Sequence, residues 1–301
     1  HSRFPVTRGD LDETIGIVHL KQVFQVPAAE RDRTRLDTLA QPVPVVPSTL
    51  DGDSLMAQIH ASGLQTAALP TAILSTHTGG FGENTFLDLS ASLPDIWAHW
   101  DKENISFDAI YLGYLGQAAS RVWEKGLEEY SRQGKLILLD PAMADHGRLY
   151  RGFDDSYVVQ MQRLARQATI LTPNLTEALL LLNEPVDFTE FDSHRACVIT
   201  QRLAQKFALS QVVLTGVPLA DNRIGVYGLS RGGRVWERTQ DRIPHSYFGT
   251  GDLFASSLLA GLLHGLDLEQ AAGVAGDFVA KAILATDLDQ DQRFGPNYAA
   301  A

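Results

Sequence analysis

Cysteine is nearly absent from the 301-residue sequence, which contains only Cys197. A single cysteine excludes an internal disulfide and a cysteine-based zinc cluster, and it suits a reducing compartment. Positive charge is also scarce, because 25 Lys and Arg residues stand against 36 Asp and Glu residues, a formal net charge of −11. Proteins that bind nucleic acid or anionic membranes need clustered positive charge, so neither kind of partner is expected.

Long apolar runs and targeting signals are missing as well. No run approaches the ~20 apolar residues that span a bilayer, and the most apolar stretch, residues 256–263, is followed by His264 and Gly265. The sequence opens on His1 with neither a signal peptide nor an initiator methionine, as if cut from a longer chain. We therefore expect a soluble, acidic, cytoplasmic protein.

Apolar runs rich in Val, Ile and Leu alternate with amphipathic stretches along most of the chain. The apolar runs are too continuous for half-exposed strands and predict buried parallel strands. These strands are predicted at residues 109–112, 135–139, 169–171 and 211–214, and helices between them at 91–101, 118–133 and 155–166. The alternation predicts an α/β fold, with an open, mostly parallel sheet and helices on both faces. Ligands bind beyond the carboxyl ends of such strands, so we expect the chemistry in the strand-to-helix loops.

The first forty residues follow a different pattern. Residues 3–6 and 15–18 predict two strands around a turn at Gly9-Asp10. The charged stretch at residues 27–35 is interpreted as a solvated linker.

The clearest chemical motif is Gly249-Thr250-Gly251-Asp252, which precedes an apolar helix predicted at residues 253–263. The glycines let backbone N–H groups converge at a helix N-terminus, which is a plausible anion hole. Asp252 could accept a proton from an attacking hydroxyl group. The structural alternative is a tight turn in which Thr250 or Asp252 caps the helix, and the four residues alone favour that alternative.

Two further motifs follow predicted buried strands. Asn174 and Glu177 have the spacing of an N-cap and its capping-box partner, so they either start a helix or hold a hydrated Mg²⁺ against phosphates. Asp140 and Asp145 are either solvated turn residues or magnesium ligands. His77, in a polar loop with two glycines, is interpreted as a substrate contact and not as a catalyst.

Six motifs, taken together and in order, resemble a known family. They lie at residues 69–81, 113–116, 140–150, 172–177, 214–216 and 249–252. From about residue 69 to 289 the chain resembles the pyridoxal/pyridoxamine kinases of the ribokinase-like superfamily. Several ordered motifs over roughly three-quarters of the chain make the resemblance specific.

The resemblance implies transfer of the γ-phosphoryl group of ATP to the 5′-hydroxymethyl group of pyridoxal, pyridoxamine or pyridoxine. It implies Asp252 as the base, and Gly249, Thr250 and Gly251 as the anion hole for the transferred group. Physically, phosphoryl transfer needs alignment, a metal and donors for the spreading charge. A homodimer is also common in the resembled family.

The remaining implied roles divide by ligand. Asn174 and Glu177 match the magnesium-and-phosphate pair, with Asp145 beside them as a further metal residue. Asp140 and Asp145 match loop acids near the ATP phosphates, Thr215 and Gly216 match the nucleotide site, and Thr78, His77 and Tyr114 match substrate contacts.

The kinase resemblance fails upstream. Members of the family open with a strand, a Gly/Ser loop that touches the substrate and a long helix, and here residues 42–62 stand in that place. Residues 1–67 instead resemble part of a CBS-domain pair of the CorC-type, haemolysin-like efflux family. The carrying segments are 1–9, 16–21 and 42–67. Neither CBS motif is complete, and Gln22 stands where an acidic, ribose-binding residue is common, so adenosine sensing is not expected.

Two partial families meeting near residues 64–68 indicate a chimera. We predict a partial CBS-like segment at 1–67 and a ribokinase-like domain at 68–301. Residues 42–67 would complete the kinase sheet, with 43–46 as the replacement strand. The first functional hypothesis is an active B6-vitamer kinase. The alternative is a folded chimera that retains an ATP site but has little or no kinase activity, and a nucleotide-sensing module ranks last.

Overall fold

The computed structural model describes residues 3–7, 14–19, 26, 33–35, 63–78, 80–188, 191–220, 222–287 and 289–298. The predicted replacement strand at residues 43–46 lies outside these residues. Contacts divide the chain into two compact units, His1–Pro47 and Ser48–Ala301. The domain boundary predicted between residues 67 and 68 stays a prediction.

The first unit contains the two strands predicted from the sequence. β1 (Arg3–Thr7) and β2 (Thr14–His19) pair antiparallel, with a register shift between Val6 and Thr7.

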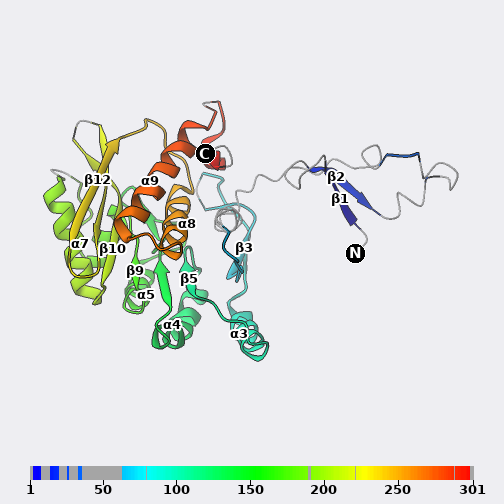
Figure 1. The fold of residues 1–301 in the computed structure, drawn as a ribbon, viewed down its shortest axis with the longest axis horizontal. Coiled ribbons are helices and arrows are strands. Elements are labelled where there is room, and N and C mark those ends of the chain that lie inside the picture. Colours follow the sequence, from blue (N-terminus) through cyan, green and yellow to red (C-terminus); the bar gives the residue numbers. More distant parts are fainter. Residues whose placement is uncertain are drawn as a thin grey trace. The chain divides into compact units, whose positions relative to one another are not determined.

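The second unit is built on a six-stranded sheet with the order β12-β11-β10-β9-β6-β5. The four predicted buried strands are confirmed as β5 (Ala109–Leu112), β6 (Leu136–Leu139), β9 (Ile170–Leu171) and β10 (Gln211–Leu219), and neighbours among them pair in parallel. β11 (Arg223–Leu229) and β12 (Val235–Asp241) extend the sheet antiparallel. The sheet is therefore mostly parallel, as predicted (Figure 1).

Helices cover both faces of the sheet, as predicted. One core includes residues of α4 (Gln117–Arg132), α5 (Asp155–Ala165), α6 (Leu175–Leu182) and α7 (Ser193–Phe207). The other includes residues of α8 (Thr250–Leu263) and α9 (Leu268–Leu284). Because side chains alternate along a strand, Ile137 and Leu139 enter the first core and Leu138 enters the second.

Smaller elements complete the second unit. β3 (Ala72–Leu74) pairs with β4 (Phe86–Asp88), and β7 (Ala144–Asp145) pairs with β8 (Arg148–Leu149), both antiparallel. A 3₁₀ turn, η4 (Ser90–Ser92), leads into α3 (Leu93–Lys102), and another, η5 (Gln292–Phe294), lies near the end of the chain. None of the helices in the described ranges combines the length and apolarity that crossing a bilayer requires.

The pairing of β11 with β12 gives a direct test of the sheet. Gly228 lies opposite Trp236, and a Cβ atom on Gly228 would come 1.9 Å from Cζ2 of the indole ring. Trp236 is 6% exposed and donates from Nε1 to the Ser230 hydroxyl. Gly228→Ala is therefore expected to lower the free energy of unfolding by about 1–3 kcal/mol in urea titrations, through overpacking.

A matched glycine provides the control. A Cβ atom on Gly276, inside α9, would meet nothing within 4 Å beyond its own stretch of helix. Gly276→Ala should raise the free energy of unfolding by about 0.5–1 kcal/mol, because alanine is the better helix former. Equal stability of Gly228→Ala and the unchanged chain would contradict the packing of the indole ring over Gly228.

Candidate active site

A cleft lies at the carboxyl ends of the parallel strands, beside the start of α8. Asp140 directly follows β6, Thr172 directly follows β9, and Thr215 belongs to β10. The other lining residues are Ala142, Tyr150, Asn174, Glu177, Gly249, Gly251, Asp252 and Phe254. The cleft volume of about 100 Å³ has room for several water molecules or a phosphate group. This is where an open parallel sheet is expected to bind a ligand.

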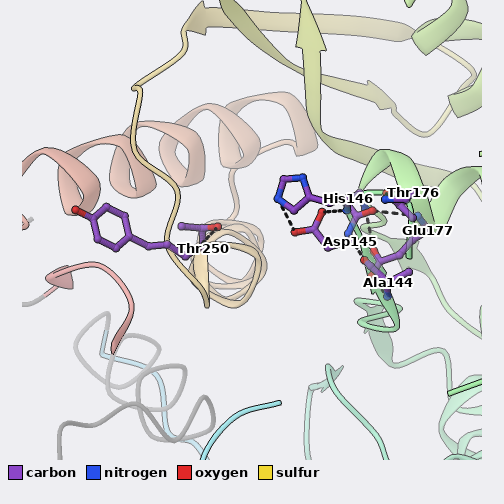
Figure 2. Close-up of polar contacts among 9 residues, drawn as sticks. Ala144, Asp145, His146, Thr176, Glu177 and Thr250 are labelled. Atoms are coloured by element: carbon purple, nitrogen blue, oxygen red, sulfur yellow. Dashed lines mark hydrogen bonds and ion pairs between the residues drawn. The ribbon is translucent and has the colours of Figure 1, made fainter. Parts of the chain in front are cut away.

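α8 begins at the predicted glycine motif. Gly249 is its N-cap, with a φ angle of 82°, a left-handed conformation that glycine adopts without steric cost. The helix starts at Thr250, so neither Thr250 nor Asp252 is the capping residue, and the alternative that assigned them this role is wrong. The Thr250 hydroxyl donates to the Tyr247 carbonyl oxygen at 3.4 Å (Figure 2). The N–H groups of the first helical turn and the helix dipole make this end of α8 suitable for an anion.

The Asp252 carboxylate is half-buried in the first turn of α8. Its Oδ1 accepts a hydrogen bond from the Tyr111 hydroxyl at 3.1 Å. The same hydroxyl lies 3.4 Å from Oδ2 of Asp140, which is 8% exposed. Two of the predicted acids are therefore joined by one tyrosine.

Sequence reasoning did not single out Tyr111, since a tyrosine within an apolar strand is typical of a core residue. A signal was available in the alternation of side chains. Tyr111 pairs with Leu138, and Asp140 lies two residues after Leu138, on the same face of the sheet.

Asn174 and Glu177 form a capping box at the start of α6, which confirms the structural interpretation of their spacing. Glu177 is 2% exposed, and both of its carboxylate oxygens accept backbone hydrogen bonds. Oε1 accepts from the N–H groups of Met143 at 3.0 Å and Ala144 at 3.4 Å, and Oε2 accepts from Asn174 at 2.9 Å. Figure 2 shows Glu177 beside Ala144, Asp145 and Thr176. Glu177 thus connects the β6–β7 loop to the start of α6.

Burial raises the pKa values of two acids in the cleft, Asp140 and Glu177. The pKa of Asp140 lies well above its usual range, because the side chain is desolvated and the Glu177 carboxylate is nearby, while the Tyr111 hydroxyl opposes the shift. Desolvation raises the pKa of Glu177 to about 8, against the three amide hydrogen bonds that favour its charged form. Burial also raises the pKa of Tyr150, and four surrounding carboxylates add to that shift. Burial therefore disfavours the charged forms of Asp140 and Glu177, and a cation beside them would favour those charged forms.

The donors around the cleft fit a hydrated cation better than a closed protein cage. No group of three or more His, Cys, Asp or Glu side chains within the described ranges could hold a metal ion by itself. Both Glu177 oxygens already accept amide hydrogen bonds, and the Asn174 side-chain amide donates to the Ala144 carbonyl oxygen at 2.8 Å. Mg²⁺ commonly keeps several water ligands and binds through one or two carboxylates and substrate phosphates. The hard oxygen donors present here fit that mode.

Three residues predicted near the nucleotide differ in their placement. Thr215 lines the cleft, and its N–H donates to the Pro173 carbonyl oxygen at 2.9 Å. Gly216 follows it in the irregular part of β10 with a φ angle of 66° and is exposed. Asp145 is exposed at the end of β7, outside the cleft lining, where its Oδ1 accepts from the His146 N–H at 2.7 Å (Figure 2).

The residues predicted to contact the substrate do not line this cleft. His77 contacts the Arg293 carbonyl oxygen through Nε2 at 2.6 Å and packs against Phe248, directly before the glycine motif. Thr78, the next residue, is half-buried.

Tyr114 belongs to a separate aromatic group. The Tyr114 ring packs against Phe153, which stacks on Tyr157. Burial raises the pKa of Tyr114. The structure brings most of the residues predicted near the phosphates into one cleft, but not Asp145 or Gly216. The predicted substrate contacts stay predictions.

Comparison with known proteins gives two kinds of match. A family model described as phosphomethylpyrimidine kinase matches residues 56–297. A structure from Bacteroides thetaiotaomicron, described as a phosphomethylpyrimidine kinase with pyridoxal, is 35% identical, with a TM-score of 0.77, over 81% of this chain and 86% of that one. The pyridoxal kinase structure from Lactobacillus plantarum is 33% identical, with a TM-score of 0.71, over 81% and 87% of the two chains.

The second match concerns the N-terminal part. A UPF0053 protein from Mycobacterium tuberculosis is 57% identical over 88 residues, which are 29% of this chain and 18% of that protein. The chain therefore spans less than a fifth of this relative. The two resemblances predicted from the sequence are both confirmed.

Proposed function

The chain belongs to the phosphomethylpyrimidine kinase family, and we propose that it transfers the γ-phosphoryl group of ATP to the 5′-hydroxymethyl group of a B6 vitamer. Family membership makes it a phosphotransferase. One observation carries the reaction: the Asp252 carboxylate lies at the N-terminus of α8, in the same cleft as Gly249 and Gly251. The pyridoxal in the Bacteroides structure supports the choice of acceptor.

In the proposed reaction the acceptor hydroxyl oxygen attacks the γ-phosphorus. A new O–P bond forms, the bond to the β-phosphate oxygen breaks, and ADP leaves with that electron pair. The hydroxyl proton passes to the Asp252 carboxylate, which acts as the base. The N–H groups at the Gly249–Gly251 end of α8 stabilise the negative charge on the transferred group. Alignment and electrostatic stabilisation supply most of the rate enhancement in such a transfer.

Magnesium is part of the proposal through Glu177 and Asn174 in the cleft, and through Asp145, which lies outside the cleft lining. Glu177, Asn174 and Asp145 would hold the hydrated ion, with Asp140 as a further acid near the ATP phosphates. When bound, the ion would neutralise charge on the phosphates. Glu177 and Asn174 are held in fixed positions by the capping box, so they can present oxygen atoms to water ligands without first rearranging.

The remaining residue roles follow the family resemblance. We assign Thr215 and Gly216 to the nucleotide, and Thr78, His77 and Tyr114 to the vitamer. The position of Thr215 supports its assignment, because Thr215 lines the cleft and forms an isolated parallel β-bridge with Asn174. A homodimer and a cytoplasmic location stay predictions from the sequence.

A coupled assay for ADP release tests the function. With Mg-ATP and pyridoxal, we expect turnover that yields pyridoxal 5′-phosphate, identified by its absorbance and mass. A phosphomethylpyrimidine in place of pyridoxal tests the other acceptor, the one that the family description names. Turnover of the pyrimidine alone would move the proposal to that acceptor. Nucleotide binding by calorimetry without turnover of either acceptor would support the folded chimera that lacks kinase activity.

A further inference from the structure

The Tyr111 hydroxyl lies between two carboxylates that come from different parts of the chain. It donates to Oδ1 of Asp252 at 3.1 Å and lies 3.4 Å from Oδ2 of Asp140. Asp252 belongs to α8, Asp140 follows β6, and Tyr111 belongs to β5. One phenol group therefore joins three elements at the point where the proposed base must be held.

The ring of Tyr111 packs against the core on one face of the sheet. In the parallel register Tyr111 pairs with Leu138, which places it on the face covered by α8. There it packs against the core that contains Leu138 and Phe254. Since the ring is part of the core packing, its hydroxyl occupies a defined position at the carboxyl end of β5.

Gly113 leaves the space that the phenol group occupies. A Cβ atom at residue 113 would lie 3.0 Å from the Tyr111 hydroxyl oxygen and 3.3 Å from Cζ. These distances are shorter than ordinary van der Waals contact. A glycine at this position therefore lets the hydroxyl group lie where it meets Asp252.

We infer that Tyr111 is a positioning residue for the phosphoryl transfer, and that it acts by fixing the orientation of the Asp252 carboxylate. The inference rests on the proposed function. A hydrogen bond from a hydroxyl group to a carboxylate is among the stronger kinds, and it restricts rotation of a side chain that is otherwise half-exposed. A base that is misoriented by a fraction of an ångström loses rate while substrates still bind. The hydroxyl should thus affect kcat more than the KM for ATP.

Tyr111→Phe tests the inference because it removes one oxygen atom and keeps the ring in the core. We expect kcat for pyridoxal to fall about 10- to 100-fold, the range for a lost hydrogen bond to a charged group. The KM for ATP should stay within about twofold of the value for the unchanged chain, since the binding of ATP before the chemical step is unaffected. Tyr227→Phe is the matched control, because the Tyr227 hydroxyl bonds to Ser193, the first residue of α7, outside the cleft lining. Loss of that hydroxyl should leave kcat unchanged.

A double variant shows whether Tyr111 acts by positioning Asp252 or by an effect that does not involve Asp252. If Tyr111 acts through Asp252, Tyr111→Phe should cost little more in an Asp252→Asn background, which is measured at high enzyme concentration. An equal fold-loss in both backgrounds would overturn the inference, as would a Tyr111→Phe enzyme with unchanged kcat. Failure of the unchanged chain to turn over any acceptor would instead count against the proposed function. In that case crystal structures decide: an Asp252 carboxylate with the same orientation in Tyr111→Phe and in the unchanged chain would overturn the positioning role.

Discussion

Asp252→Asn should lower the turnover of pyridoxal by about 10²- to 10⁴-fold, the usual contribution of a general base. Asparagine has nearly the same shape, and its amide oxygen can still accept the Tyr111 hydrogen bond that Asp252 accepts at 3.1 Å. It cannot take up the hydroxyl proton. The variant should therefore fold normally and bind ATP as before, and only the chemical step should slow.

The measurement is the initial rate of ADP release with saturating Mg-ATP and pyridoxal, beside calorimetric binding of ATP. Asp95→Asn is the control, because Asp95 is an exposed acid in the first turn of another helix, α3. It should leave turnover unchanged. Full activity of Asp252→Asn would exclude Asp252 as the base. Loss of ATP binding in the same variant would mean that this carboxylate supports the nucleotide site and not proton transfer.

The fold was largely predictable because its central strands are buried on both faces. Such strands are continuous apolar runs, and the runs at 109–112 and 135–139 agree with β5 and β6 to within one residue. The antiparallel extension was not predicted. β12 includes Glu237, Arg238 and other polar residues, so it lacks the apolar run by which the central strands were identified.

The phosphate side of the site was predictable for a geometric reason. Parallel strands end at one edge of a sheet, so the segments after β6 and β9 bring Asp140 and Asn174 to one cleft although they lie far apart in the sequence. Orientation is harder to predict, because it depends on packing between elements. Asp145 follows the same strand as Asp140 and yet is exposed outside the cleft lining.

The two interpretations of Asn174 and Glu177 are compatible. The capping box fixes the start of α6, and the same contacts hold Glu177 in the cleft. The structural role and the proposed ligand role therefore depend on one set of hydrogen bonds, which is why sequence spacing alone could not separate them. A substitution at Glu177 should show both roles at once.

Glu177→Ala should lower the free energy of unfolding by on the order of 3 kcal/mol. It leaves three N–H groups, of Met143, Ala144 and Asn174, without the carboxylate that accepts their hydrogen bonds. Each buried donor left without an acceptor costs about 1–3 kcal/mol, and release of the buried acid offsets part of that sum. Urea titration measures the change. Glu128→Ala on the exposed face of α4 is the control and should shift stability by less than about 0.5 kcal/mol.

Glu177→Gln separates the two roles, because glutamine keeps one oxygen acceptor and loses the charge. Its Oε1 can still accept from the Met143 and Ala144 N–H groups, but its NH₂ group would face the Asn174 N–H, a donor like itself. The free energy of unfolding should therefore fall less in Glu177→Gln than in Glu177→Ala. The Mg²⁺ concentration needed for half-maximal turnover should rise at least as much in Glu177→Gln as in Glu177→Ala, since both variants lose the charge. If Glu177→Gln needed no more Mg²⁺ than the unchanged chain, the carboxylate would be a connector between the β6–β7 loop and α6 and would have no part in holding the ion.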